Sequence, residues 1–475
     1  MKKLTDILKN TPVREVCGDT AAAIGGLVYD SRAVKPGDCF FAVPGTQSDG
    51  HDYIPIAVEK GAAAIVCERM PADAAEGVAY VLVGDSAGAM ADMAAAFYDY
   101  PSRELKLVGI TGTNGKTTTA TLLYDLVRAM GYKAGLISTV VYKIDGREVE
   151  ATHTTPDSIR LNAMMREMAD AGCAYCFMEC SSHAIVQERT RGLDFAGGIF
   201  SNITHDHLDY HKTFAEYIRA KKLFFDGLPK GAFALTNADD RNGRVMVQNT
   251  AAAVSAYSLR AMADFRCKIV EMHLDGMLLR IDGQELWVGL LGRFNAYNLL
   301  AVYGAAALLG LNRGEVLRVL SMLHAVSGRF EKIRAANGTT AIVDYAHTPD
   351  ALENVIQTIE EIRTPGQQLI VVCGCGGDRD RTKRPEMAAI AVKYATTAVF
   401  TSDNPRHESP EAILDDMVAG LEPGARYLRI ADRAEAIRTA VMLSRPGDII
   451  LVAGKGHETY QIVGDVKHPF DDREE

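Results

Sequence analysis

The stretch from residue 105 to residue 120, LKLVGITGTNGKTTTA, holds the residue types that bind a phosphate group. An apolar run leads into Gly112 and Gly115, and an apolar-periodic stretch follows Lys116 and Thr117, which predicts a strand, a loop and a helix in that order. Backbone N–H groups at a helix start attract phosphate, and glycines let the backbone come close to it. The lysine adds a point charge, and the threonine hydroxyl can bind Mg²⁺.

This loop is shorter than the common P-loop, which has four residues between its first glycine and Gly-Lys-Thr. Only Thr113 and Asn114 separate Gly112 from Gly115, and position 110 is an isoleucine. We therefore predict a shortened phosphate loop. Its expected ATP-binding residues are Gly112, Thr113, Asn114, Gly115, Lys116, Thr117 and Thr118. The alternative is a polar strand-to-helix turn, in which Gly-Lys-Thr-Thr would stand at a helix start by chance.

Two further apolar runs end in polar groups. Residues 175–178 lead into Glu179, and residues 198–200 lead into a histidine-rich stretch that contains His207. Ligands of an open parallel sheet bind beyond the carboxyl ends of its strands. Glu179 is therefore expected where an NTPase places its metal-binding acid, with His207 as a second Mg²⁺ ligand. A zinc site and a purely structural loop remain open alternatives.

Residues 214–225, FAEYIRAKKLFF, have the periodicity of an amphipathic helix. Taken alone, that periodicity favours a solvated charged face for Lys221 and Lys222.

Three polar loops, at 374–384, 403–408 and 454–458, follow strand-like runs in the last third of the chain. The strand-end rule predicts that they converge on one crevice. A zwitterionic amino acid needs a cationic clamp and an acidic partner. The loops offer both, through Arg379, Asp403, Asn404, Arg406, Lys455, His457 and Glu458. The alternative is an ordinary polar surface with a few ion pairs.

The composition excludes several classes of protein. A formal charge of −10 argues against a general binder of nucleic acids or anionic membranes. The first residues lack the apolar core of a secretory signal, and the longest apolar stretch, 299–311, is too short to span a bilayer. Nine cysteines, an odd number in which Cys173-x-x-Cys176 has no second pair at zinc spacing, are typical of reduced core residues. We expect a cytoplasmic protein with no nucleic-acid partner and no membrane insertion.

Strand-like and helix-like runs alternate nearly throughout, which predicts an α/β fold. The length of 475 residues suggests about three domains. We place their boundaries at polar breaks, to give an N-terminal domain over 1–101, a central P-loop ATPase domain with a mostly parallel sheet over 102–328, and a Rossmann-like C-terminal domain over 329–475.

Ten segments taken in order resemble the Mur ligase superfamily of ATP-dependent, amide-forming enzymes. They are TGTNGKTTT, MECSSHAIVQER, NITHDHLDYH, YIRAKKLFF, GRFNAYNLLA, SGRFE, DYAHTP, GGDRDRTKRP, DNPRHE and AGKGHE. The resemblance covers essentially the whole chain. It implies a UDP-binding N-terminal domain, a central ATPase and a C-terminal domain that brings an amino acid. It also implies ATP as co-substrate, two Mg²⁺ ions, an acyl-phosphate intermediate and a role in peptidoglycan precursor synthesis, and we expect a monomer.

The resemblance assigns roles at matching positions. The residues implied to bind UDP-N-acetylmuramoyl-L-alanyl-D-glutamate are Tyr29, Ser31, Thr46, Gln47, Ser48, Thr154, Thr155, Ser181, Gln187 and Arg189. Further implied ATP contacts are Asn295, Arg329, Asp344 and His347. Lys221 matches a lysine that CO₂ carbamylates, which turns it into a metal ligand and contradicts the solvated-face interpretation. The metal set becomes Thr117, Glu179, His207 and Lys221, and the catalytic set becomes Lys116, Glu179, His207 and Lys221. The chain has a histidine at position 153, where some relatives have an asparagine before the Thr-Thr pair.

The motif Asp403-Asn404-Pro405-Arg406 resembles the form found in superfamily members that add meso-diaminopimelate, and the resemblance adds Arg379, Gly454 and Glu458 to that site. Three rivals remain at this point. Folylpolyglutamate synthetase typically has Gly-Lys-Gly-Ser in its loop. A P-loop kinase or a nucleotide-switch protein would explain residues 105–120 but not the C-terminal loops.

Overall fold

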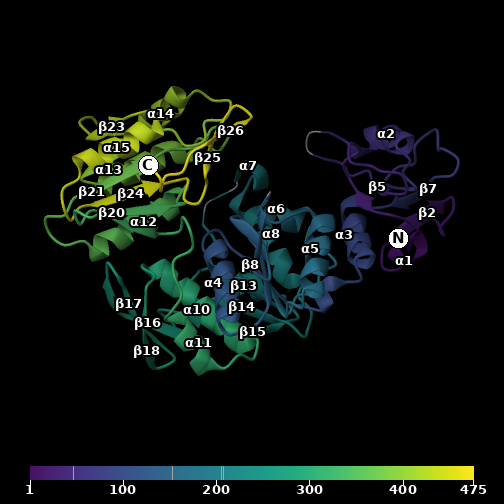
Figure 1. The fold of residues 1–475 in the computed structure, drawn as a ribbon, viewed down its shortest axis with the longest axis horizontal. Helices are drawn as coiled ribbons and strands as arrows, with labels where there is room; N and C mark the ends of the chain where they lie inside the picture. Colours follow the sequence, from purple (N-terminus) through teal and green to yellow (C-terminus); the bar gives the residue numbers. More distant parts are fainter. Residues whose placement is uncertain (46–47, 152, 205, 207) are drawn as a thin grey trace.

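The computed structural model describes residues 1–45, 48–151, 153–204, 206 and 208–475. Figure 1 shows three bodies, each built on its own β-sheet, with the N-terminal body beside the central one and the C-terminal body on the other side of it. This confirms the predicted α/β class with three domains. The exact boundaries after residues 101 and 328 stay predictions.

The N-terminal body has a five-stranded sheet in the order β2-β7-β6-β5-β4, parallel except for β2. Its strands are β2 (Val13–Cys17), β4 (Leu27–Val28), β5 (Cys39–Phe41), β6 (Ala64–Cys67) and β7 (Ala79–Val83). Beside it lie β1 (Lys2–Lys3), β3 (Ala23–Ile24), α1 (Leu4–Ile7), η1 (Gly50–Tyr53), α2 (Ile54–Glu59), α3 (Ser86–Phe97) and η2 (Pro101–Arg103). The Asp85 carboxylate caps α3 by accepting from Gly88 N.

The central body has an eleven-stranded sheet in the order β11-β10-β9-β12-β8-β13-β14-β15-β16-β17-β18. The strands from β9 to β16 in that order run parallel, and an antiparallel pair extends each edge. The predicted mostly parallel sheet is therefore confirmed. The strands are β8 (Lys106–Thr111), β9 (Ala134–Ile137), β10 (Val141–Ile144), β11 (Arg147–Glu150), β12 (Tyr175–Glu179), β13 (Gly197–Phe200), β14 (Phe233–Asn237), β15 (Ala253–Ser258), β16 (Phe265–His273), β17 (Gly276–Ile281) and β18 (Gln284–Val288).

The middle strands of this sheet are buried along their whole length because helices cover the sheet. The helices are α4 (Lys116–Ala129), α5 (Ser158–Asp170), α6 (Ser182–Val186), α7 (Leu208–His211), α8 (Phe214–Asp226), α9 (Gly243–Val247), α10 (Arg293–Leu308) and α11 (Arg313–Leu320). The predicted amphipathic helix is α8, and Thr213 begins it by accepting from Glu216 N, in the Thr-x-x-Glu pattern of a capping box.

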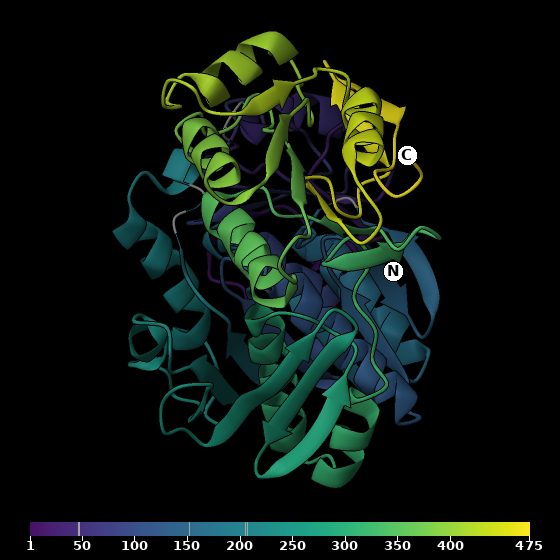
Figure 2. The ribbon, with the colours of Figure 1, turned by 90° about the vertical axis from the view of Figure 1, so that its left-hand side faces the viewer.

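The C-terminal body has a six-stranded sheet in the order β19-β20-β24-β21-β22-β23, parallel except for β19. Figure 2 shows it lying above the central body. Its elements are β19 (Glu331–Arg334), β20 (Thr340–Asp344), α12 (Pro349–Ile362), β21 (Leu369–Cys373), α13 (Lys383–Tyr394), β22 (Thr397–Phe400), α14 (Pro410–Val418), β23 (Tyr427–Arg429), α15 (Arg433–Leu443), β24 (Ile449–Ala453) and the hairpin of β25 (Tyr460–Val463) and β26 (Val466–Pro469).

All nine cysteines carry free thiols, and eight of them are buried. Among the described residues, no helix combines the length and the apolar character needed to cross a membrane.

Candidate functional site

The phosphate loop joins the end of β8 to the start of α4, so the predicted order of strand, loop and helix is confirmed. Gly112 has φ of +150° and Gly115 has φ of +85°. A Cβ on Gly112 would lie 1.9 Å from Ser201 Oγ, and one on Gly115 would lie 2.5 Å from Asn298 Oδ1. Both positions therefore need glycine, for backbone conformation and for space.

The segment that follows β13 holds the loop in place. Thr113 N donates to Asn202 O at 2.8 Å and Asn114 N donates to Asn202 Oδ1 at 2.9 Å. Ser201 Oγ donates to Asn114 O at 2.6 Å. The first N–H groups of α4 have no carbonyl one turn earlier in the helix, which leaves this end suited to an anion.

Two lysines converge on the loop. Lys116 Nζ donates to Gly112 O at 2.9 Å and to Thr113 O at 2.8 Å, and Lys221 Nζ donates to the same Gly112 O at 2.7 Å. Burial lowers the pKa of Lys116. Burial, followed by the positive charge of Lys116, holds the pKa of Lys221 well below its usual range.

The solvated-face interpretation is therefore wrong for Lys221, which is 1% exposed. The neighbouring Lys222 points elsewhere and pairs with Asp226 at 2.6 Å.

Glu179 ends β12, which runs parallel to β8, so its carboxylate lies at the same sheet edge as the phosphate loop. The side chain is 1% exposed. Its Oε1 accepts from Thr139 N at 2.7 Å, whereas Oε2 is buried without a hydrogen-bond partner among the described residues. The charge of Glu179 raises the pKa of Lys116, which shows that the two side chains are close. A cation beside Oε2 would satisfy this buried oxygen.

The remaining predicted metal ligands are only partly described. The Thr117 hydroxyl accepts from Arg329 Nη2 at 3.1 Å, and His207 lies outside the described residues. Within the described part of the chain, no group of three or more His, Cys, Asp or Glu side chains is arranged to hold a metal ion. A metal site here needs a further ligand, and the carbamate expected at Lys221 would be one.

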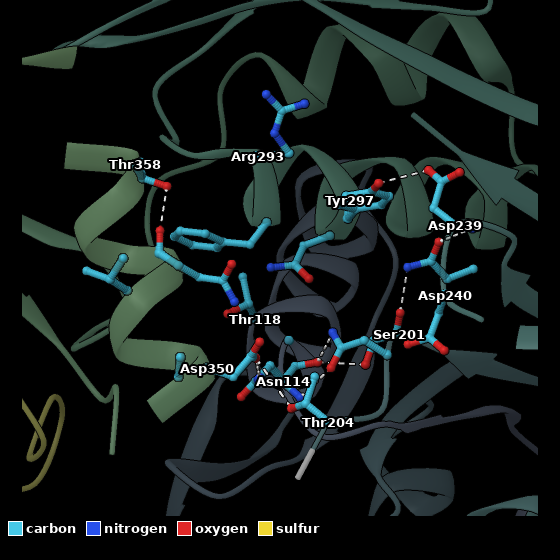
Figure 3. Close-up of a pocket in the computed structure, with 18 of the residues that line it drawn as sticks. Asn114, Thr118, Ser201, Thr204, Asp239, Asp240, Arg293, Tyr297, Asp350 and Thr358 are labelled. Carbon is cyan, nitrogen blue, oxygen red and sulfur yellow. Dashed lines mark hydrogen bonds between the residues drawn. The ribbon is translucent and has the colours of Figure 1, made fainter. Parts of the chain in front are cut away.

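A cavity of about 350 Å³ lies beside the phosphate loop, between the central body and α12 of the C-terminal body. Figure 3 shows Asn114 and Thr118 on the loop side, Asp350 and Thr358 from α12, and Tyr297, which donates to Asp239 at 2.8 Å. Of the predicted ATP-binding residues, those that line this cavity are Asn114, Gly115, Thr118, Arg329 and Asp344. His347 is not among its lining residues; its Nδ1 donates to Tyr345 O at 2.8 Å.

Asn295 lies behind this cavity rather than on its wall. It donates to Leu291 O at 2.7 Å, and its Oδ1 accepts from Asn298 Nδ2 at 3.1 Å. Asn298 is the residue that faces the cavity, and sequence reasoning missed it. The motif GRFNAYNLLA gave no local signal that would separate the two asparagines, because residues three positions apart lie on the same face of a helix.

Arg329 and Asp344 sit where the central and C-terminal bodies join. Asp344 Oδ2 accepts from Phe330 N at 2.7 Å, and burial raises the pKa of Asp344 to about 6 against the opposing effect of Arg329. The Arg329 guanidinium also lies over the Tyr345 ring, 4.6 Å from its centroid. Arg329 thus contacts Thr117 on one side and Tyr345, the residue after β20, on the other.

Five residues expected to hold the muramoyl-dipeptide lie together beside Glu179, namely Thr154, Thr155, Ser181, Gln187 and Arg189. Thr155 Oγ1 donates to Glu179 O at 2.7 Å and accepts from Ser181 N at 3.2 Å. Arg189 donates to Thr155 O at 2.7 Å and to Gln187 Oε1 at 2.6 Å. A carboxylate held by this group would lie close to the phosphate loop.

The predicted uridine-binding residues belong to the N-terminal body. Tyr29 is 48% exposed, and its pKa is raised by burial and by Asp157, while Arg189 opposes the rise. Ser31 is buried and Ser48 is exposed. Thr46 and Gln47 lie outside the described residues. The backbone of His153 is held by the Tyr142 hydroxyl, through His153 N at 3.1 Å and His153 O at 2.5 Å.

The three C-terminal loops meet, as predicted. Asn404 Nδ2 donates to Glu458 Oε2 at 2.8 Å, and Lys455 Nζ donates to Asn404 Oδ1 at 3.1 Å and to Glu458 Oε2 at 3.0 Å. A Cβ on Gly454, where φ is +120°, would lie 2.6 Å from Asp403 Oδ2. That carboxylate oxygen is buried without a partner among the described residues.

Two arginine side chains lie close together among these loops, since a Cβ on Gly376 would lie 2.9 Å from Arg406 Nη1 and 3.7 Å from Arg379 Cγ. Arg406 Nη1 donates to Gly377 O at 2.9 Å, and the pKa of Arg406 is lowered by burial and then by the neighbouring charge of Arg379. Because arginine stays protonated, two such groups side by side favour a bound carboxylate.

Sequence reasoning missed the support of this pocket, the Arg384–Glu408 pair at 2.8 Å, which ties the first loop to the second. The Arg384 side chain is fully buried, and it lowers the pKa of Glu408 to about 2. The alternating charges of GGDRDRTKRP were the sequence feature that indicated an ion pair in this loop.

Three family models match this chain. They are the Mur ligase family, catalytic domain, over residues 23–98, the Mur ligase middle domain over residues 110–306, and the Mur ligase, glutamate ligase domain over residues 328–456.

Similar proteins extend over the whole chain. A UDP-N-acetylmuramoyl-L-alanyl-D-glutamate–2,6-diaminopimelate ligase of Phocaeicola vulgatus is 56% identical, with 99% of this chain and 98% of that protein covered. The enzyme of the same name from Bacteroides fragilis is 55% identical with the same coverage. A solved structure of a ligase of that name is 32% identical, has a TM-score of 0.71, and is matched over 100% of this chain and 97% of its own. This chain therefore belongs to the Mur ligase family of ATP-dependent, amide-forming enzymes.

Proposed function

We propose that this ligase adds meso-diaminopimelate to UDP-N-acetylmuramoyl-L-alanyl-D-glutamate, through an acyl phosphate, in peptidoglycan precursor synthesis. The observation that carries the proposal is that the Arg406 and Arg379 side chains both approach Gly376, in the same cluster of loops as the Asp403 Oδ2, which is buried without a partner among the described residues. The names of the similar proteins support the same substrates.

The chemistry begins with a carboxylate of the dipeptide, which is a poor acyl donor and is repelled by ATP. The carboxylate attacks the γ-phosphorus, the bond to ADP breaks, and an acyl phosphate forms. The amine of the incoming amino acid then attacks the acyl carbon, so that an amide forms and phosphate leaves. The start of α4 and Lys116 would stabilise the negative charge on the transferred group, because positioning and electrostatics dominate phosphoryl transfer.

Mg²⁺ would be held by Thr117, Glu179, His207 and carbamylated Lys221, and when bound it would neutralise phosphate charge. The Oε2 of Glu179, buried without a partner in the described part of the chain, suits a cation. The lowered pKa of Lys221 favours its neutral amine. Only that form attacks CO₂; the new N–C bond and the loss of a proton turn the lysine into a carboxylate.

The amino acid would lie in the C-terminal pocket. Arg406 and Arg379 suit a carboxylate, and the free Oδ2 of Asp403 suits an ammonium group. Diaminopimelate carries a carboxylate and an ammonium group at each end, whereas lysine lacks the far carboxylate and glutamate lacks the far ammonium group. The pocket therefore suits diaminopimelate better than either.

Water must stay away while the acyl phosphate exists. The ATP cavity is lined by two bodies, and Asn114 Nδ2 of the phosphate loop donates to Asp350 Oδ2 of α12 at 2.9 Å. Closure of the C-terminal body over the nucleotide would therefore shield the intermediate. A cytoplasmic location and a monomeric state stay predictions.

The test is a panel of amino acids in an assay of phosphate release, with the mass of each product determined. Release should require ATP, the UDP-muramoyl-dipeptide and diaminopimelate together. Steady release without dipeptide or amino acid would favour a nucleotide switch, and a preference for lysine would contradict the assigned pocket.

A further inference from the structure

The hairpin of β25 and β26, drawn in yellow in Figure 1, forms a support for the amino-acid pocket that the motif DNPR does not contain. Its backbone bonds directly to the motif. Ile462 N donates to Asn404 Oδ1 at 2.9 Å, Arg406 N donates to Ile462 O at 3.1 Å, and Gly464 N donates to Arg406 O at 2.8 Å.

These bonds hold Arg406 in an unfavourable backbone conformation. Its φ is +51°, in the left-handed region that a residue with a side chain adopts only when its surroundings impose it. A parallel bridge between Arg406 and Val463 supplies that constraint. From this conformation the guanidinium reaches Gly377 O and lies beside Arg379.

One side chain of the hairpin acts on the residue where the motif begins. Gln461 Nε2 donates to Asp403 O at 2.6 Å. Asp403 is buried, and its Oδ1 accepts from Asn404 N at 2.7 Å, which leaves Oδ2 without a partner among the described residues. The carbonyl that Gln461 holds belongs to the peptide plane between Asp403 and Asn404. Its orientation therefore sets the directions in which both side chains leave the backbone.

We propose that Gln461 is a positioning residue for the amino-acid substrate, acting through the Asp403 carbonyl on the loop from Asp403 to Arg406. This proposal rests on the proposed function for the identity of the amino acid. Gln461 touches no reacting atom in it. Its role is to keep the Asp403 Oδ2 and the Arg406 guanidinium in one fixed arrangement. The ammonium group and the carboxylate of the amino acid can then be bound at the same time.

Two variants separate the donated hydrogen bond from the shape of the side chain. Gln461→Met keeps the length and removes the donor, and Gln461→Glu keeps the outline and loses the donor at neutral pH. Each should raise KM for diaminopimelate by about 3- to 30-fold, the range expected for a lost hydrogen bond that leaves a buried carbonyl unpaired. KM for ATP, KM for the UDP-muramoyl-dipeptide and the thermal midpoint should change little. The matched control is Val466→Ala, in the same hairpin with a side chain 57% exposed, which should leave every constant unchanged.

A double variant tests whether Gln461 acts through the loop. If it does, Gln461→Met should add little to the effect of Arg406→Ala, because one arrangement cannot be lost twice. The proposal is overturned if both Gln461 variants keep the wild-type KM for diaminopimelate, if all three KM values rise together with a lower midpoint, or if the two losses multiply in the double variant. A wild-type enzyme that uses another amino acid instead would overturn the proposed function alone, since the same variants would then be measured with that amino acid.

Discussion

The phosphate loop and the proposed amino-acid pocket bring polar and charged groups together in two different ways. The loop is one continuous segment, residues 111–118, shaped by its own glycines and completed by the helix it starts. The pocket combines residues 374–384, 403–408, 454–458 and 460–464, which only the folded C-terminal sheet brings together. A site made from one segment carries its function in its local sequence, whereas a site made from several depends on the contacts between them.

The two regions also use different cations. The loop has Lys116 and Lys221 on one carbonyl oxygen, and burial lowers the pKa of both. The proposed pocket has Arg379 and Arg406 instead, and a guanidinium group stays protonated in proteins. Lysine can become neutral and react, whereas arginine keeps the planar, doubly donating group that recognises a carboxylate. In the proposed function, the lysines therefore stand where the chemistry takes place and the arginines where the amino acid is recognised.

The substitution Lys116→Ala tests the role of the lysine in the phosphate loop, and we expect it to reduce activity the most. We expect kcat to fall by about 10²–10³, because the lysine stabilises charge in the transition state. The fold should remain, since the hydrogen bonds that Lys116 makes to described residues both go to its own loop. Phosphate release at saturating ATP measures the effect, with Lys222→Ala as the control because that lysine pairs with Asp226 instead. Near-normal turnover would contradict the phosphate-loop assignment.

Variants of Lys221 test whether this buried lysine is carbamylated, a reaction that is not expected of an arginine at the same position. Lys221→Ala should lose nearly all activity, about 10² or more by the same measure of a lost charge stabiliser, and a small added carboxylic acid should restore part of it. Lys221→Arg should stay inactive, because it keeps the positive charge that carbamylation removes. Phosphate release with and without the acid decides the matter; full activity of Lys221→Arg would exclude the carbamate.

Arg406→Ala tests recognition in the pocket. A hydrogen bond to a charged group is worth about 1.5–3 kcal/mol, so KM for diaminopimelate should rise by about 10- to 150-fold. KM for ATP should change little, and lysine should remain a poor substrate, since removing a clamp creates no site for an ammonium group. The ratio of kcat/KM for the two amino acids measures this. Unchanged use of diaminopimelate would show that Arg406 does not contact it.

Asp344, which lies where the central and C-terminal bodies join, should make the free energy of unfolding depend on pH. Burial raises its pKa to about 6, against about 3.9 in an unfolded chain, so the folded protein binds this proton more tightly. The free energy of unfolding should therefore fall as the pH rises from about 4 to about 6, by at most about 2–3 kcal/mol from this group. Asp344→Asn should remove that part of the pH dependence in urea unfolding. If wild type and Asp344→Asn show the same pH profile, a group other than Asp344 causes the pH dependence.

Much of both sites followed from the sequence. The run from apolar residues through glycines to Lys116 predicted the phosphate loop, because strand, loop and helix signals there are local. Placing Glu179 at the same edge followed from the rule that parallel strands end together, and the three C-terminal loops met for the same reason. The order of the motifs predicted the α/β class and the three domains.

Only the tertiary structure decided which side of a helix or loop is buried. Neighbouring Lys221 and Lys222 differ by about 100° around α8, and the direction of the core, not the spacing, separated the buried one from the paired one. Asn298 lines the cavity beside the phosphate loop and Asn295 does not, although both belong to α10. The bond from Gln461 to Asp403 spans 58 positions of the chain. Local sequence sets conformation over a few residues, but contacts between distant segments exist only once the sheet has folded and brought their ends together.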